Sequence, residues 1–289
     1  MMAAICRAAH QMLDDDPKIL RDPIALKFLS EGELAALRSR DPALMAMANP
    51  FTRAHFCQRS RVAEDCMERA AARGVDQFII LGAGLDSFAY RQPPWAQSSK
   101  VVEVDHPDTQ KAKIELIRSR DLGPPGNVAY VAADLARGSL IDRLDQTGID
   151  TARPIFVSWL GVSQYLPADA VSAVLRALAG WRGGCGLVMT YVLADWSNLQ
   201  AEVRAGAERT MQWAASVGEP WLSSFSETTI IDVLRSAGFV GQKTFAASEL
   251  RSIYLRHGQA FDVAANPSRI IASYTTQDAA SCFDLEPAR

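Results

Sequence analysis

Residues 77–86 read Gln-Phe-Ile-Ile-Leu-Gly-Ala-Gly-Leu-Asp, a continuous apolar run that stops abruptly at two glycines. An uninterrupted apolar run followed by a turn is typical of a parallel strand whose two faces are both covered. Similar apolar runs recur along the chain at 101–105, 128–131, 154–159 and 186–191. Helical periodicity separates them over 107–120, 136–147 and 168–182. This alternation predicts an α/β fold built on a doubly wound, mostly parallel sheet.

The regions on either side of this core are expected to extend it. Residues 1–75 have helical patterns only, and residues 195–226 interrupt the rhythm with a helical segment over 197–216. We expect this insertion to lie over the carboxyl edge of the sheet as a lid. The rhythm then resumes with one helix and two strand candidates, at 227–237, 239–245 and 269–274. The chain is therefore predicted to form a single domain with a seven-stranded sheet and four parts, at 1–75, 76–194, 195–226 and 227–289.

Composition excludes several classes of protein. Apolar residues make up 48% of the chain and charged residues 22%, as in a folded globular protein rather than a disordered or fibrous one. The formal net charge of -3 offers no positive field to nucleic acid, and no apolar segment approaches the roughly 20 residues that span a bilayer. Because the N-terminal residues also lack the features of a secretory signal, we expect a cytoplasmic protein without nucleic-acid or membrane partners. Five scattered cysteines and four isolated histidines give no pattern of metal ligands.

The glycine turn after the first strand indicates which ligand binds there. In a doubly wound sheet, ligands bind beyond the carboxyl ends of the strands, where the strand order reverses. Gly82 and Gly84, on either side of Ala83, let the backbone turn and approach a ligand closely. A dinucleotide-binding turn needs a third glycine where Ser87 stands, and Asp86 would repel a pyrophosphate. These residues argue against a nicotinamide dehydrogenase and favour a cofactor that has a cationic end and no phosphates.

Acidic residues after the next two strands predict the rest of the cofactor. Asp105 ends the second strand, where a carboxylate accepts hydrogen bonds from ribose, and Glu103 competes for this role from the same strand face. After the third strand, Asp134 can accept a hydrogen bond from an adenine amino group and Leu135 can form an apolar wall. Adenine, ribose and a cationic amino-acid end together describe S-adenosyl-L-methionine. We expect the core over 76–194 to bind this cofactor.

Several motifs are spread over most of the chain. They are Arg7-Ala8-Ala9-His10-Gln11, Arg21-Asp22-Pro23-Ile24-Ala25, Arg59-Ser60-Arg61, Gly82-Ala83-Gly84-Leu85-Asp86-Ser87-Phe88-Ala89-Tyr90-Arg91, Val104-Asp105-His106-Pro107, Asp134-Leu135 and Tyr165-Leu166-Pro167. The block that begins at Gly82 and the Val-Asp-His-Pro motif are distinctive, whereas the Asp-Pro and Asp-Leu pairs are not. With these motifs the chain resembles the leucine carboxyl methyltransferase family, especially its bacterial S-adenosylmethionine-dependent members of unassigned substrate. The resemblance implies a class I methyltransferase fold.

The resemblance also implies roles for single residues. Arg61 would pair with the cofactor carboxylate, although its spacing from Asp65 also fits an ordinary ion pair on a helix surface. The turn at Gly82–Gly84 would pass under the amino-acid end of the cofactor. The complete set of cofactor-binding candidates is Arg61, Gly82, Ala83, Gly84, Asp86, Asp105, His106, Asp134, Leu135, Trp159 and Leu160.

One position departs from the family pattern. Many members have a glutamate after the fourth strand, at the position where this chain has Leu160. Any role of that glutamate toward the cofactor ammonium or the substrate is therefore missing here. The departure favours a subgroup with its own substrate.

The predicted reaction is direct in-line transfer of a methyl group to an oxygen atom of a small molecule or peptide. A carboxylate is favoured because it is ionised at neutral pH, whereas the phenol or hydroxyl group of a secondary metabolite, the first alternative, needs a general base. A non-catalytic sensor or interaction protein that keeps the cofactor pocket is an alternative from another class. Candidates for the acceptor pocket are Trp159, Tyr165, Tyr191 and Trp221. The oligomeric state is left open.

Overall fold

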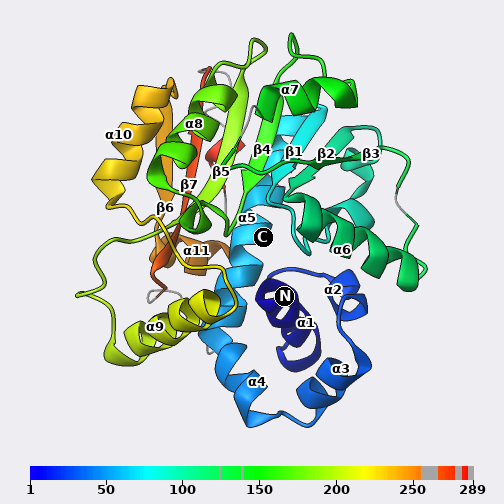
Figure 1. Ribbon diagram of the computed structural model, residues 1–289, viewed down its shortest axis with the longest axis vertical. Coiled ribbons are helices and arrows are strands. Elements are labelled where there is room, and N and C mark those ends of the chain that lie inside the picture. Colours follow the sequence, from blue (N-terminus) through cyan, green and yellow to red (C-terminus); the bar gives the residue numbers. More distant parts are fainter. Residues whose placement is uncertain (124, 138–139, 255–265, 277–281, 286–289) are drawn as a thin grey trace.

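The glycine turn follows the third strand from one edge of a seven-stranded sheet in the computed structural model of the protein (Figure 1). The structure describes residues 1–123, 125–137, 140–254, 266–276 and 282–285. The strands are β1 (Gln77–Leu81), β2 (Lys100–Asp105), β3 (Val128–Ala132), β4 (Ile155–Trp159), β5 (Cys185–Val192), β6 (Gly241–Phe245) and β7 (Ser268–Tyr274). Within this sheet the order is β3-β2-β1-β4-β5-β7-β6, and β7 runs antiparallel to both of its neighbours. The predicted doubly wound, mostly parallel sheet is confirmed.

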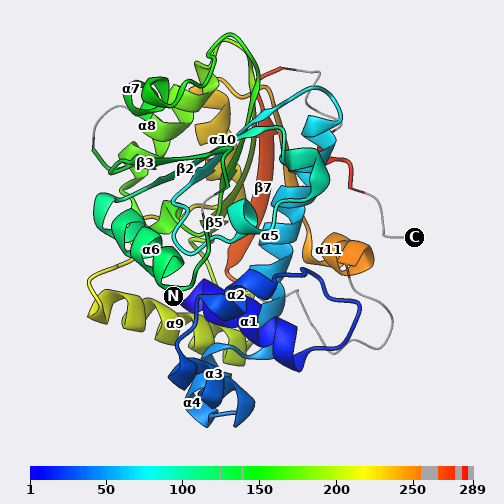
Figure 2. The ribbon, with the colours of Figure 1, turned by 90° about the vertical axis from the view of Figure 1, so that its right-hand side faces the viewer.

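Helices cover both faces of the sheet. The α-helices are α1 (Met2–Leu13), α2 (Pro23–Lys27), α3 (Glu31–Arg38), α4 (Pro42–Met47), α5 (Pro50–Ala71), α6 (Pro107–Ser119), α7 (Leu140–Leu144), α8 (Ala168–Ala179), α9 (Ala201–Ser216), α10 (Glu227–Ala237) and α11 (Ala247–Tyr254). Two perpendicular views place α7, α8 and α10 on one side of the sheet and α5 and α11 on the other (Figure 1, Figure 2). None of the helices in the described ranges is long and apolar enough to cross a bilayer.

Side-chain alternation along β1 divides the core into two clusters. Ile79 and Leu81 pack in the cluster that includes α8 and α10, whereas Phe78 and Ile80 pack in the cluster that includes α5 and α11. The helix α8 contributes an apolar stripe at i, i+3, i+4 and i+7 over Val171–Leu178. The continuous apolar run of β1 therefore follows from burial of both its faces.

One predicted helix is shorter in the structure, and a short turn replaces a helix after the glycine turn. The helix expected over 136–147 is shorter, because α7 ends at Leu144 and a 3-10 turn follows over Asp145–Thr147; residues 138–139 lie outside the described ranges. After the glycine turn the chain forms a 3-10 turn over Phe88–Tyr90. A single short turn aligns few peptide dipoles, so it provides a much weaker positive end than an α-helix.

Asp-Pro and Asn-Pro pairs divide the first 75 residues into separate helices. Asp22, Asp41 and Asn49 are the N-caps of α2, α4 and α5, and each side chain accepts a backbone N–H at 3.0 Å. Proline fits the next position because its missing N–H would have no partner in the first turn. The predicted first-turn proline at Pro23 is confirmed.

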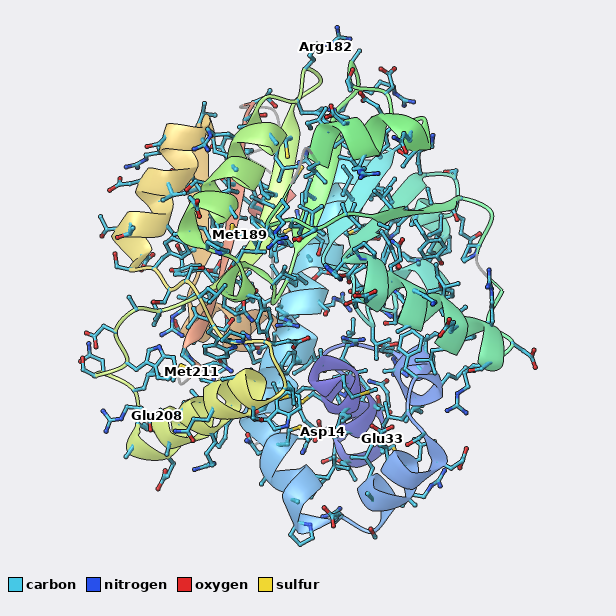
Figure 3. The ribbon with its side chains drawn as sticks, in the orientation of Figure 1. Asp14, Glu33, Arg182, Met189, Glu208 and Met211 are labelled. Carbon is cyan, nitrogen blue, oxygen red and sulfur yellow. The ribbon has the colours of Figure 1, made fainter. Side chains whose placement is uncertain are left out.

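Asp14 connects the end of α1 to α5 through hydrogen bonds. Its carboxylate, labelled in Figure 3, accepts hydrogen bonds from His10 Nδ1 at 2.7 Å and from Arg53 Nε at 3.1 Å. All three side chains are nearly buried. The helix α1 is therefore held against α5 by charge as well as by apolar packing.

A second buried carboxylate joins the N-terminal helices to the glycine turn. Asp22 is fully buried, and its Oδ2 accepts hydrogen bonds from Arg7 Nε at 2.8 Å and from Ser87 Oγ at 2.6 Å. Arg91 Nε lies 3.4 Å from the other oxygen of Asp22, and the same guanidinium donates to Glu64 of α5 at 2.8 Å. Burial opposes the charged form, but Arg7 and Arg91 hold the pKa of Asp22 below its ordinary value. One ionic network thus connects α1, α2, α5 and the turn.

The substitution Asp22→Asn should lower the free energy of unfolding by about 3–5 kcal/mol, because it leaves buried guanidinium groups without their counter-charge. Urea denaturation at neutral pH measures the loss. Since the pKa of Asp22 is lowered by folding, its contribution is present at neutral pH and should be lost as the pH falls below about 4.

The matched control is Asp16→Asn, because Asp16 pairs with Arg21 on the exposed surface at 3.2 Å. An exposed pair contributes little, so this variant should unfold like the wild type. Equal effects of the two substitutions would show that the Asp22 network does not hold the N-terminal helices in place.

Candidate functional site

A cavity of about 1340 Å³ opens at the carboxyl ends of β1, β2, β3 and β4. The helices α1, α5 and α9 and the segment 218–222 complete its wall. The predicted site residues that line it are Gly82, Ala83, Gly84, Asp86, Asp105, His106, Asp134, Leu135, Leu160, Tyr165 and Trp221. The predicted residues that do not line it are Arg61, Trp159 and Tyr191. Within the part of the chain that the structure describes, no three His, Cys, Asp or Glu side chains are arranged to hold a metal ion.

The two glycines of the turn serve different purposes. Gly82 has φ +63°, and a Cβ at this position would overlap the side chain of Val162, which follows β4. Gly84 has φ +45°, but a Cβ there would meet no protein atom closer than 3.9 Å. Gly82 thus lets two loops pack together, whereas Gly84 leaves an open surface on the cavity side. A ligand can approach the backbone closely at Gly84.

Asp105 is held in place by the backbone around it. Its Oδ2 accepts the N–H of Gly84, and its Oδ1 accepts the N–H of His106 at 2.7 Å. Burial raises the pKa of Asp105, and these two N–H donors oppose the rise. Each carboxylate oxygen can accept a further hydrogen bond, so Asp105 can still bind hydroxyl groups of a ligand.

The turn after β3 brings a second carboxylate to the same edge. The N–H of Ala133 donates to the backbone oxygen of Asp105 at 2.7 Å, which fixes the end of β3 beside the end of β2. Asp134 then accepts the N–H of Ala136 at 2.9 Å through Oδ1. The half-exposed Asp134 and Leu135 form one wall of the cavity.

Asp86 gives the glycine turn a negative charge. Its Oδ1 accepts the N–H of Phe88 at 2.8 Å and so begins the 3-10 turn that follows. Its carboxylate is half-buried and borders the cavity. The turn therefore presents a carboxylate to a ligand in the place where a dinucleotide-binding turn presents the positive end of a helix.

The structure places Arg61 outside the wall of the cavity. Its side chain is 43% exposed and donates to Asp65 at 2.7 Å, which is the ordinary surface pair that the spacing allowed. Arg59 lines the cavity instead, because residues two apart on an α-helix lie on nearly opposite faces.

Arg59 is a half-buried cation near the negative charge of Asp86 but not in a salt bridge with it. Its guanidinium lies 4.2 Å from the ring centre of Phe56 and would be 2.5 Å from a Cβ at Gly161. Burial and the nearby charge of Arg7 lower the pKa of Arg59 to about 10, so it remains charged at neutral pH. It forms no salt bridge with any carboxylate in the described ranges. Arg59 is thus available to bind an anionic group in the cavity.

Trp159 and Tyr191 belong to the core rather than to the cavity. Both are at most 1% exposed and pack in the cluster that includes α8 and α10. Strand alternation explains this, since Ser158 and Leu160, on either side of Trp159, face the cavity. The indole Nε1 of Trp159 and the hydroxyl of Tyr191 are buried without a hydrogen-bond partner among the described residues. Neither residue can contact an acceptor in this arrangement.

His55 was not identified as a candidate from the sequence. It lies one helical turn before Arg59 on α5 and borders the same cavity, so its i, i+4 spacing from Arg59 was the available signal. Burial, together with the charges of Arg59 and Arg269, lowers the pKa of His55 to about 3. Its imidazole is therefore neutral at physiological pH.

Two of the three tryptophans of the insertion border the cavity. Trp221 lines it and packs edge-to-face on Trp196, with ring centres 6.2 Å apart. Trp213 of α9 also lines it. The predicted lid is therefore part of the cavity wall, opposite the acidic residues at the sheet edge.

The sequence of the chain is similar to those of known proteins. A family model described as leucine carboxyl methyltransferase matches residues 1–179. A Bacillus subtilis relative, named as the S-adenosyl-L-methionine-dependent methyltransferase YktD, is 27% identical over 88% of this chain and 90% of its own length. A Mycobacterium marinum relative with the same enzyme name is 30% identical over 89% of this chain and 84% of its own length.

Solved structures share the fold. A Thermobifida fusca protein described as a methyltransferase is 19% identical, with a TM-score of 0.56 over 94% of this chain and 93% of its own. A DUF574 family protein from Streptomyces avermitilis is 17% identical, with a TM-score of 0.53 over 93% of this chain and 96% of its own.

The matched residues 1–179 contain α1, α5, the glycine turn and the acidic ends of β2 and β3, all of which line the cavity. The chain belongs to the leucine carboxyl methyltransferase family and is an S-adenosyl-L-methionine-dependent methyltransferase.

Proposed function

We propose that this enzyme methylates a carboxylate oxygen of a small-molecule or peptide acceptor. S-adenosyl-L-methionine, when bound, supplies an activated methyl group that can pass in line to a nucleophilic oxygen. The chain then has to align the acceptor and exclude water. The cavity of about 1340 Å³ supports this proposal, because a pocket for one ligand usually measures roughly 300–1,000 Å³. Space therefore remains for an acceptor beside the cofactor.

The adenosine part of the cofactor fits the carboxyl ends of β1, β2 and β3. In this proposal Asp105 accepts hydrogen bonds from the ribose hydroxyls, and Asp134 and Leu135 border the adenine. His106, which is exposed beside Asp105, forms the outer edge of this part of the cavity. The open surface at Gly84 supports the assignment, since the backbone there leaves a ligand room to approach.

The amino-acid end of the cofactor carries both charges, and the cavity has a partner for each. Asp86 would pair with the ammonium group, a role that Leu160 cannot share because it has no charge. Arg59 would pair with the cofactor carboxylate, in place of Arg61. The unpaired state of Arg59 among the described residues and its position on the cavity side of α5 support this assignment.

The choice of a carboxylate acceptor rests on His55. A phenol or alcohol has to lose a proton, and a general base works best with a pKa near the operating pH. His55 lies in the cavity wall on α5, but its pKa of about 3 makes it a poor base. In this proposal the cofactor occupies the carboxylates of Asp86, Asp105 and Asp134, so they are not available as the general base. A carboxylate acceptor needs no base, because it is already ionised at neutral pH.

Arg59→Gln should weaken binding of S-adenosylhomocysteine about 10- to 100-fold, because it removes a charge-assisted hydrogen bond to the cofactor carboxylate. Isothermal titration calorimetry measures the dissociation constants. Arg61→Gln is the matched control, since its partner is Asp65, and it should bind like the wild type. A larger loss of affinity for Arg61→Gln than for Arg59→Gln would show that Arg61, and not Arg59, pairs with the cofactor carboxylate.

Carboxylate methylation predicts a product that alkali destroys. With methyl-labelled S-adenosylmethionine and a mixture of small carboxylic acids and phenols, the product label should become volatile methanol after alkaline treatment, because methyl esters are hydrolysed and methyl ethers are not. The rate should change little between about pH 6 and 9, since the acceptor is ionised throughout.

Two outcomes contradict the proposal. Label that stays in an alkali-stable product shows transfer to a phenol or hydroxyl group. A thermal shift with S-adenosylhomocysteine, combined with no labelled product from a whole metabolite extract, shows a cofactor-binding sensor.

A further inference from the structure

Exposed apolar side chains gather at the mouth of the cavity. The large apolar residues with exposed side chains in the described ranges are Met1, Phe51, Met211, Trp213, Val217, Leu222 and Val240. Of these, Met1, Phe51, Trp213 and Leu222 line the cavity. Phe51 is 43% exposed, Trp213 45% and Leu222 54%, and we call these three residues, which do not belong to the chain terminus, the apolar rim. Large apolar side chains that are exposed and line a cavity are typical of a binding site.

The rim comes from three separate segments. Phe51 begins α5, Trp213 is in the last turn of α9, and Leu222 follows α9 in the segment 218–222. Since these positions are far apart in the sequence and border one cavity, the rim is a feature of the folded cavity and not of one apolar stretch. Inside the rim, the wall continues with the apolar side chains of Met47, Phe56, Val203 and Ala207.

The charged residues of this wall do not interrupt the apolar surface. Glu202, Arg209 and Glu219 also border the cavity, but all three are exposed. Long charged side chains at such positions can keep their ends in water while their stems pack on apolar groups. The wall formed by α9 and the segment 218–222 therefore differs from the acidic wall at the sheet edge.

We infer that the acceptor is an amphipathic carboxylic acid whose apolar tail passes from the cavity across the rim of Phe51, Trp213 and Leu222. This inference rests on the proposed function, because it places the carboxylate inside the cavity beside the cofactor. An apolar tail is the occupant that this lining favours, since the exposed side chains of the rim and the apolar side chains of Met47, Phe56, Val203 and Ala207 line one cavity.

The inferred tail can be tested with straight-chain carboxylic acids of about four to twelve carbons and, in parallel, 4-alkylphenols of matching chain lengths. The full-length enzyme is assayed for release of S-adenosylhomocysteine, and kcat/KM is compared along each series. Each methylene that enters apolar surroundings should raise kcat/KM about threefold to fourfold, until the tail has passed the rim.

Trp213→Ala should flatten this dependence and lower kcat/KM of the longest substrates about tenfold relative to the shortest. The matched control is Met211→Ala. Met211, labelled in Figure 3, is an exposed apolar residue of the same helix that does not line the cavity. This control should keep the wild-type profile. Both variants should show the wild-type thermal shift with S-adenosylhomocysteine, which verifies folding and the cofactor site.

The outcomes separate the inference from the proposed function. A rise of kcat/KM with chain length for the acids, lost in Trp213→Ala and kept in Met211→Ala, supports both. The same pattern for the phenols with no turnover of the acids supports the apolar tail and overturns the carboxylate. A flat profile in both series, no turnover in either, or equal effects of the two variants overturns the tail, and the rim then serves another partner such as a protein or a membrane surface.

Discussion

The buried carboxylate of Asp22 is the constraint on which the cavity depends. It begins a helix, accepts a hydrogen bond from the glycine turn through Ser87, and faces the guanidinium groups of Arg7 and Arg91. These contacts place α1 and α5 against the turn, so the cavity has a wall opposite the sheet edge. They also explain why Ser87 replaces the third glycine of a dinucleotide-binding turn. A hydroxyl at that position is needed to satisfy the Asp22 carboxylate, and a carboxylate buried without such donors would be costly.

Charges in the cavity are arranged by the ends of the secondary-structure elements. Asp105 and Asp134 stand where β2 and β3 end, and backbone N–H groups orient both carboxylates. Arg59 borders the cavity from α5, and Asp86 borders it at the glycine turn. A ligand with an ammonium, a carboxylate and ribose hydroxyls can satisfy all of these groups at once. A dinucleotide would bring phosphates to Asp86, whose carboxylate repels them. The placement of charge therefore argues against a dinucleotide independently of the missing third glycine.

The sequence predicted the strands, the turn and the carboxylates because these depend on local pattern. Asp105 follows a strand directly, and parallel strands bring their carboxyl ends to one edge wherever the helices lie. Arg59, Trp159 and Tyr191 could not be placed in the same way, because a shift of one or two residues moves a side chain to the other face of its helix or strand. The face on which each side chain lies depends on packing between elements that are distant in sequence, such as α1 against α5. The i, i+4 spacing of His55 from Arg59 becomes informative only once Arg59, rather than Arg61, is known to border the cavity.

The two walls of the cavity differ in how strongly the fold constrains them. The sheet-edge wall is formed by residues that end core strands, and their backbone is fixed by the sheet. The helix α9 buries only Ala207 and Ala214 among its residues, so it adds little to the core. Substitutions elsewhere on α9 can therefore change the shape of this wall of the cavity at small cost to stability. The family model ends at residue 179, before α9 begins. The inferred acceptor tail therefore depends on Trp213 and Leu222, which lie outside the matched residues, and on Phe51, which lies within them.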